Sequence, residues 1–110
     1  MMIFSPFELS RKLYPLLKKS GKASVINIAS VAANQDVKSG APYGMAKSGL
    51  LQQTRSLAAE WAIDNIRVNA VSPWYTETPL TEAVFNQKDR LAHIISRTPM
   101  QRVAQPEEMA

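Results

Sequence analysis

The sequence predicts an α/β fold whose strands form a parallel sheet of the doubly wound type. Two short apolar runs rich in β-branched residues, 23–30 (ASVINIAS) and 66–72 (IRVNAVS), have the composition of buried strands. A long helical pattern lies between them, from Pro42 to about Asp64. A strand, a helix and a second strand form a βαβ unit, whose strands are parallel and whose crossover is right-handed.

A helix is expected before the first strand, and we predict that it begins near Ser5. Ser5 suits the N-cap, Pro6 the first helical position, and Glu8 the third position of a capping box. Leucines then recur at helical spacing until SGK, residues 20–22, ends the pattern. The length of the chain is enough for one modest domain, so residues 1–110 are expected to form a single domain.

A second helical region is expected after the second strand, which Pro73 terminates. Thr78 and Pro79 have the residue types of an N-cap and first helical position, so we predict a polar helical segment over 79–96. Pro106 is expected to start a further helix.

Composition excludes several kinds of site. The chain has no cysteine, which rules out disulfides and thiolate catalysis, and its one histidine, His93, has no second histidine nearby to build a zinc site. No apolar run is long enough to span a bilayer, and the first residues lack the pattern of a signal peptide. We therefore expect a cytoplasmic protein without a membrane or a metal.

The net charge of +4 is spread along the chain. The densest basic group lies in residues 11–22, where leucines interrupt it. A nucleic-acid surface is one interpretation, but the solvated face of an amphipathic helix accounts for the pattern better. Nucleic acid is not expected as a partner.

Three residues with complementary chemistry are expected at one rim of the sheet. Ser30 follows the first strand, and the carboxyl ends of parallel strands are where α/β sheets bind ligands. Tyr43 and Lys47 lie near the start of the connecting helix, and their spacing of four places them on one helical face.

Together these residues suit proton transfer beside a hydride transfer. A free tyrosine ionises at a pH of about 10, and a nearby ammonium favours its phenolate form. The hydroxyl of Ser30 could hold a carbonyl oxygen while Tyr43 exchanges a proton with it. The chain has no hydride donor of its own, so a nicotinamide cofactor would have to supply one.

The motifs NIASVAA, YGMAK and IRVNAVSP resemble the second half of the short-chain dehydrogenase/reductase family. Flanking stretches such as YPLLKKSG and SLAAEWAIDNIRVNAVSP resemble its tropinone-reductase-like branch. The resemblance implies a partial Rossmann-like fold. It also implies a small ketone or secondary alcohol as substrate and NADP(H) in preference to NAD(H) as cofactor.

The resemblance further implies roles for individual residues. Ser30 would orient the carbonyl, Tyr43 would be the catalytic acid/base, and Lys47 would support the tyrosine while binding the nicotinamide ribose. The resemblance assigns cofactor contacts to Tyr43, Lys47, Pro73, Tyr75 and Thr78 and a substrate loop to residues 76–96. Pro73 and Thr78 also fit a strand stop and a helix cap, and the two interpretations are compatible.

The sequence departs from the family pattern in three ways. It has no glycine-rich dinucleotide turn, Met2 stands where the family carries an asparagine, and Trp74 stands where it usually carries a glycine. The chain is therefore expected to be a fragment, inactive by itself.

Two hypotheses follow from this departure. The first is the catalytic half of a nicotinamide-dependent oxidoreductase. The second is a catalytically silent remnant that acts as an oligomerising module. Open strand edges and apolar helix faces predict a homo-oligomer in either case, assembled through the helices near 6–19 and 42–64.

Overall fold

The computed structural model describes residues 4–110 and confirms an α/β fold with a parallel two-stranded sheet. The chain divides into two compact units, one that ends at Ser72 and one that runs from Pro73 to Ala110. Met2 lies outside the described residues.

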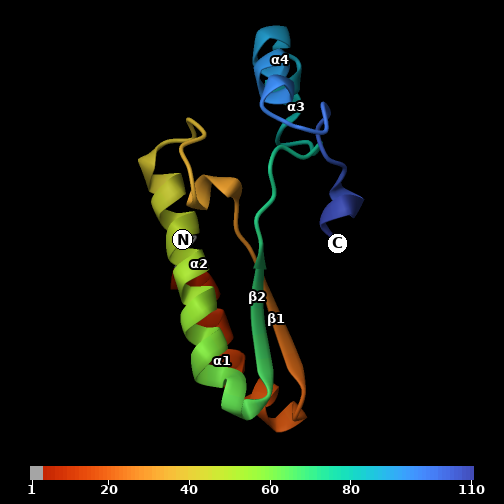
Figure 1. Ribbon diagram of the computed structural model, residues 1–110. Coiled ribbons are helices and arrows are strands. Elements are labelled where there is room, and N and C mark those ends of the chain that lie inside the picture. The colour runs from red at the N-terminus through yellow and green to blue at the C-terminus, as the bar shows by residue number, and fades with distance from the viewer. Residues whose placement is uncertain (1–3) are drawn as a thin grey trace. The chain divides into compact units, whose positions relative to one another are not determined.

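The first unit contains the predicted βαβ arrangement (Figure 1). The helix α1 (Phe4–Ser20) leads into the strand β1 (Ala23–Ile28), and α2 (Ala41–Trp61) leads into β2 (Ile66–Val71). Two short 3₁₀ turns, η1 (Val31–Ala33) and η2 (Ala62–Asp64), precede and follow α2. The strands pair in parallel from Ala23↔Ile66 to Ile28↔Val71, which confirms the predicted βαβ topology.

The predicted start of the first helix is wrong. Phe4 is already helical, so Ser5 lies in the first turn of α1 and is not its N-cap. Pro6 is tolerated there because backbone N–H groups in the first turn have no helical partner to lose. The end of the helix was predicted correctly, since Gly21 follows Ser20 in the left-handed conformation, with φ +71°.

Both helices cover the same face of the sheet (Figure 1). The core beneath them has four buried residues with five partly buried ones packed against it: Leu57, Trp61, Ile66 and Val68, then Tyr14, Leu17, Ala23, Val25 and Ala58. Burying a side chain of this size contributes roughly 1.5–3 kcal/mol, so this cluster holds α1 and α2 to the sheet.

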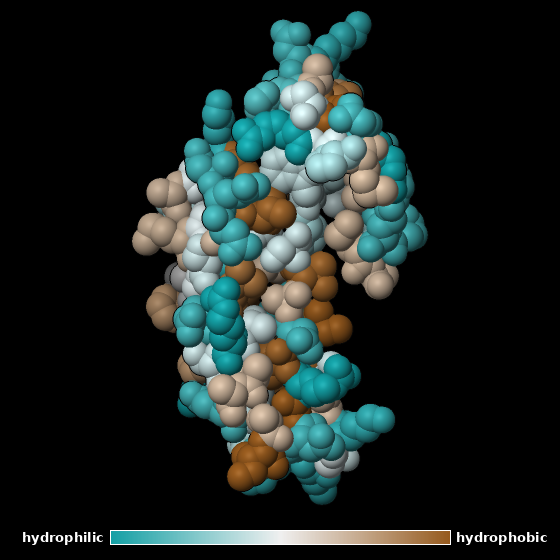
Figure 2. Space-filling model, in the orientation of Figure 1, coloured by the Kyte–Doolittle hydropathy of each residue, from teal (hydrophilic) through white to brown (hydrophobic). Residues whose placement is uncertain are grey.

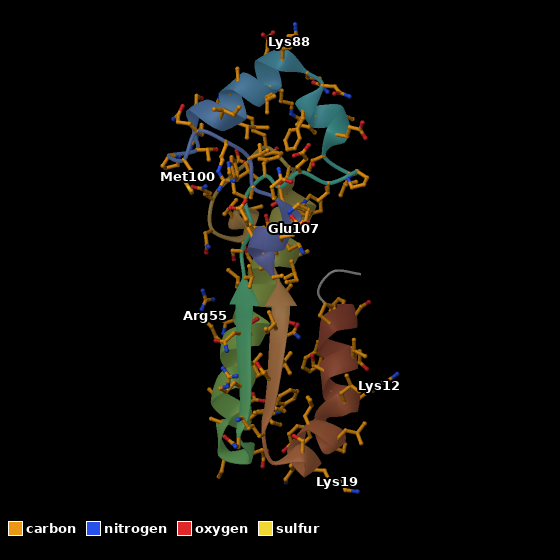
Figure 3. The ribbon with its side chains drawn as sticks, turned by 90° about the vertical axis from the view of Figure 1, so that its right-hand side faces the viewer. Lys12, Lys19, Arg55, Lys88, Met100 and Glu107 are labelled. Carbon is orange, nitrogen blue, oxygen red and sulfur yellow. The ribbon has the colours of Figure 1, made fainter. Side chains whose placement is uncertain are left out.

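The other face of the sheet is bare, which corrects the prediction of a strand buried on both faces. Burial along β1 alternates, and Ile26 and Ile28 are 60% and 54% exposed. Figure 3 looks onto this face, with β1 and β2 in front of α2. The apolar composition of β1 suits a sheet covered on both sides, but the second layer is absent from residues 4–110.

Two basic residues of the first helix lie on its outer side. Lys12 and Lys19 point away from the sheet in Figure 3. Lys18 pairs with Asp64 at 3.7 Å, and the Tyr14 hydroxyl donates a hydrogen bond to the same carboxylate. That hydrogen bond raises the pKa of Tyr14, because the carboxylate stabilises the protonated phenol. Asp64 thereby ties α1 to the end of α2.

The second unit contains two short helices where one longer helix was expected. The predicted continuous helix over 79–96 is wrong: a turn over 79–81 precedes α3 (Glu82–Phe85), and Asn86 and Gln87 separate it from α4 (Lys88–Ser96). The chain cannot stay helical there because Gln87 has an extended backbone, with ψ 100°.

Hydrogen bonds just before α3 explain where the helical structure starts. Thr81, not Thr78, precedes α3, and its hydroxyl donates to the carbonyl oxygens of Thr76 and Thr78 at 2.7 and 3.1 Å. These hydrogen bonds stabilise a turn at Pro79, where a helix was expected to begin. Pro106 does begin the short 3₁₀ helix η3 (Pro106–Met109). A capping box between Gln105 and Glu108 stabilises its N-terminus.

None of the helices in the described part of the chain is both long and apolar enough to cross a bilayer.

Candidate active site at the carboxyl end of β1

The chain leaves β1 through Ser30, which caps the turn η1. Ser30 has an extended backbone, and its Oγ accepts a hydrogen bond of 3.1 Å from the backbone N–H of Ala32. Just before it, the Ala29 N–H donates to the Val71 carbonyl oxygen at 2.7 Å, which extends the pairing with β2 to this point. Within residues 4–110, the hydroxyl proton of Ser30 meets no acceptor.

The first turns of α2 pack closely against η1. A Cβ added to Gly44 would lie 3.4 Å from the Ala32 carbonyl oxygen, at van der Waals distance, so the two segments are in contact at this point. One turn on, the Ser48 hydroxyl donates to the Ala33 carbonyl oxygen at 2.7 Å. These contacts fix the start of α2 beside the segment that carries Ser30.

Lys47 connects the helix to the strand. Its Nζ donates a hydrogen bond of 3.0 Å to the carbonyl oxygen of Ile28, the last residue of β1. The same Nζ lies 5.8 Å from the centre of the Tyr43 ring, one helical turn earlier. The structure therefore places the ammonium beside the tyrosine and at the carboxyl end of β1.

Tyr43 is half-buried, and its hydroxyl makes no hydrogen bond within residues 4–110. An ammonium has three donors, and Ile28 occupies one of those of Lys47. The remaining donors and the phenol are thus available to bind oxygen atoms of a ligand. Such groups suit the hydroxyl-rich ribose end of a nicotinamide cofactor.

The residues present fit only that end of a dinucleotide. A pyrophosphate is usually held by a glycine-rich turn at a helix N-terminus, and the sequence has no such turn. Among residues 4–110, no three His, Cys, Asp or Glu side chains gather in a way that could hold a metal ion.

The other predicted cofactor contacts lie in the second unit. Pro73 and Tyr75 are half-buried, and the Tyr75 carbonyl oxygen accepts a hydrogen bond of 3.1 Å from Ala104. The Tyr75 ring meets the Trp74 ring edge-on, with the centroids 4.8 Å apart. The backbone N–H of Thr78 donates to Thr81 Oγ1 at 2.9 Å.

The structure also assigns contacts that the sequence analysis missed. The indole N–H of Trp74 donates to Thr98 Oγ1 at 2.9 Å, and Thr98 Oγ1 donates to the Ile94 carbonyl oxygen at 2.7 Å. In the first unit, the buried Asn27 amide donates to Thr54 Oγ1 at 3.0 Å. The only available signal for Asn27 was a polar residue inside an apolar run.

Comparisons with protein families and with curated proteins both find reductases. The profile of a protein family described as enoyl-(acyl carrier protein) reductase matches residues 1–110. A tropinone reductase homolog of Arabidopsis thaliana is 48% identical over 106 residues, which are 96% of this chain and 40% of that protein. The chain thus spans well under half of the relative it matches.

Two solved structures extend the comparison to the fold. A gluconate 5-dehydrogenase of Burkholderia cenocepacia, in complex with NADP and tartrate, superposes with a TM-score of 0.88 at 28% identity, over 94% of this chain and 40% of that one. A 4-hydroxyisoleucine dehydrogenase complexed with NADH gives a TM-score of 0.91 at 32% identity, over 97% of this chain and 44% of that one.

Proposed function

Because the chain belongs to the short-chain dehydrogenase/reductase family, we propose that it forms the catalytic part of a nicotinamide-dependent oxidoreductase. Hydride would pass between the cofactor and a small ketone or secondary alcohol. The observation that carries the proposal is the position of Lys47, whose Nζ is bonded to Ile28 at the end of β1 and lies 5.8 Å from the Tyr43 ring.

In this proposal Tyr43 exchanges a proton with the substrate oxygen. The free hydroxyl of Ser30 donates a hydrogen bond to the same oxygen and orients it. Lys47 stabilises the phenolate by its charge and holds the ribose with the donors that Ile28 leaves available. The cofactor, when bound, supplies or accepts the hydride.

We propose NADP(H) in preference to NAD(H), on the strength of the tropinone-reductase-like relatives. The two solved structures above carry NADP and NADH, which supports a nicotinamide cofactor of either kind. Pro73, Tyr75 and Thr78 are proposed to line the nicotinamide, and residues 76–96 to contact the substrate.

A chimera tests the chemistry without requiring this chain to work alone. In it, the chain replaces the 106-residue segment that it matches in the Arabidopsis relative. We expect the chimera to oxidise NADPH in the presence of small ketones, and Tyr43→Phe to abolish turnover while leaving the circular dichroism spectrum unchanged. A folded, cofactor-binding chimera whose turnover survives Tyr43→Phe would contradict the role of the tyrosine.

A second candidate function, a catalytically silent oligomerising module, is favoured by the exposed apolar side chains of α1. Phe4, Leu9 and Leu16 are 61%, 60% and 66% exposed. Fluorescence titration of the 110-residue chain with NADPH and NADH separates the candidates. Binding of either cofactor supports the catalytic function. No binding at about millimolar cofactor, a concentration far above the dissociation constants of ordinary recognition, supports the oligomerising module.

Self-association is proposed through the helices near 6–19 and 42–64, and light scattering during size exclusion tests it. A stable monomer would contradict it.

We also propose a cytoplasmic location. A fluorescent fusion of the full-length protein that concentrates in a plastid would contradict that proposal.

A further inference from the structure

Asn27 is a polar side chain on the covered face of β1. Burial along the strand alternates, so Asn27 shares the face of Val25, beneath the helices, and is 8% exposed. Ile26 and Ile28 face the other way and are 60% and 54% exposed. Figure 2 shows hydrophobic residues at the surface along the side where Figure 1 places the strands. Hydrophobic burial therefore does not explain why an amide points inward from this strand.

The Asn27 amide begins a chain of hydrogen bonds that ends in the backbone of α2. Its Nδ2 donates to Thr54 Oγ1 at 3.0 Å, and Thr54 Oγ1 donates to the Leu50 carbonyl oxygen at 2.8 Å. Thr54 and Leu50 are 7% and 3% exposed, so water competes little for these bonds. Linked hydrogen bonds in a low-dielectric interior strengthen one another. The threonine hydroxyl both accepts and donates, which fixes its orientation between strand and helix.

Two side-chain hydrogen bonds join α2 to β1 within residues 4–110. One is the bond from Asn27 to Thr54, and the other is the bond of 3.0 Å from Lys47 to the Ile28 carbonyl oxygen. Thr54 lies seven residues beyond Lys47, which is about 10.5 Å along a helix that rises 1.5 Å per residue. Two links this far apart fix both the position of α2 along the strand and its rotation about its own axis.

The apolar contacts of α2 specify this alignment less sharply. Leu57 and Trp61 of α2 pack with Ile66 and Val68 of β2. Apolar side chains tolerate small shifts by repacking, whereas a hydrogen bond needs its donor and acceptor about 2.7–3.2 Å apart. A buried polar pair can therefore select one arrangement among several that an apolar core would accept.

We propose that Asn27 and Thr54 are positioning residues for the acid/base tyrosine, a proposal that rests on the proposed function. Ser30 follows the strand, whereas Tyr43 and Lys47 belong to α2. By setting α2 along β1, the buried hydrogen bond sets where the phenol and the ammonium lie relative to the serine hydroxyl. A shift of about 1 Å in a reacting group can lower turnover about a hundredfold.

Three variants separate alignment from stability. Thr54→Val leaves the Asn27 amide without its acceptor, Asn27→Val combined with Thr54→Val makes both side chains apolar, and Thr54→Ser keeps the hydroxyl. The double variant should regain part of the stability that Thr54→Val loses, because it buries no polar group without a partner.

Turnover should not return with stability. In the chimera with the Arabidopsis relative, we expect Thr54→Val and the double variant to lower kcat at least about tenfold. KM for the ketone should change less than about twofold, because Ser30 stays with the strand. Thr54→Ser should keep kcat near its original value.

Hydrogen exchange in the 110-residue chain gives a readout that needs neither cofactor nor turnover. We expect the backbone amides of residues 44–51 to exchange roughly fivefold faster in Thr54→Val and in the double variant, and at nearly the original rate in Thr54→Ser. Ile66→Val trims the core at the opposite end of the sheet and controls for a general loss of stability. Its effect should not concentrate in residues 44–51.

The positioning proposal is wrong if kcat and the exchange rates return to their original values in the double variant, because the pair would then serve stability alone. Equal effects of Ile66→Val and Thr54→Val on residues 44–51 would also overturn it. An inactive chimera, with exchange rates in the chain as expected, would count against the proposed function and leave the alignment of α2 intact. An active chimera whose kcat is unchanged by Thr54→Val would do the reverse.

Discussion

Lys47 donates a hydrogen bond from its Nζ to the carbonyl oxygen of Ile28, across the gap between the second turn of α2 and the end of β1. The contact is 3.0 Å long. It gives the lysine a structural role in addition to the chemical role proposed for it, because it fixes the helix that carries Tyr43 to the strand that leads to Ser30.

The first prediction concerns this double role. Lys47→Met removes the donor but keeps an aliphatic side chain, and we expect it to lower the free energy of unfolding by about 1 kcal/mol. Chemical denaturation of the 110-residue chain measures the loss, with the exposed Lys19→Met as control. In the active chimera, the same substitution should shift the acid/base limb of the pH–rate profile to higher pH. An unshifted profile would leave the lysine with only its structural role.

The second prediction concerns the buried pair Asn27 and Thr54, which are 8% and 7% exposed. Thr54→Val leaves the Asn27 amide without its acceptor inside the first unit, so we expect a loss of about 1–3 kcal/mol in the free energy of unfolding. Asn27→Val combined with Thr54→Val removes both polar groups. The double variant should lose less than the sum of the single variants, as denaturation of all three can show, and strict additivity would refute the coupling.

The third prediction concerns pH at the carboxyl end of the chain. Two hydrogen bonds from Arg102, aided by one from the Gln105 N–H, lower the pKa of Glu108 to about 2. An unfolded glutamate has a pKa of about 4.3. Because the folded value is the lower one, the contribution of this contact to stability is fully present above about pH 4.3 and is lost as the pH falls towards 2.

Carboxyl-carbon NMR titration measures this pKa directly. Arg102→Gln should raise it towards the ordinary value and move the loss of η3 to higher pH, whereas Arg97→Gln should not. A Glu108 titration that is the same with and without Arg102 would contradict the assignment.

The fourth prediction concerns the hydrogen bond between Trp74 and Thr98, which holds together the two ends of the segment that contains α3 and α4. Trp74→Phe keeps an aromatic ring but removes the N–H donor. If the bond contributes about 1 kcal/mol, local opening becomes roughly fivefold more frequent. Limited trypsin digestion at Lys88 and Arg90 measures this opening. The Thr98→Ser variant keeps the acceptor and should be digested at nearly the original rate. Equal rates for the original chain and both variants would count against a stabilising role of the Trp74–Thr98 hydrogen bond.

The fold class was predictable because its signals are local. The β-branched runs at 23–30 and 66–72, and the long helical pattern between them, fix a strand, a helix and a strand from composition and spacing alone. The parallel pairing then follows from topology, and it is confirmed. The placement of Tyr43 and Lys47 on neighbouring turns of one helix needed only the helical period. Their roles remain predictions.

The failures have physical causes that lie outside the local pattern. The helix over 79–96 was wrong because Thr81 satisfies the carbonyl oxygens of Thr76 and Thr78, and because Gln87 leaves helical geometry. Ile26 was expected to be buried because its residue type suits a covered sheet, yet burial depends on a second layer and not on β1 itself. The partner of Lys47 was invisible because it is a backbone carbonyl.

The sequence by itself determined the order of strands and helices, the direction of the pairing and the family resemblance, because each of these depends on residue types at short spacing. Only the tertiary structure decided that α1 and α2 share one face, that the other face and the outer edge of β1 stay uncovered, and that Lys47 reaches across to Ile28. Burial and hydrogen bonds between distant segments arise from packing, and packing sums contributions that no single stretch of residues contains.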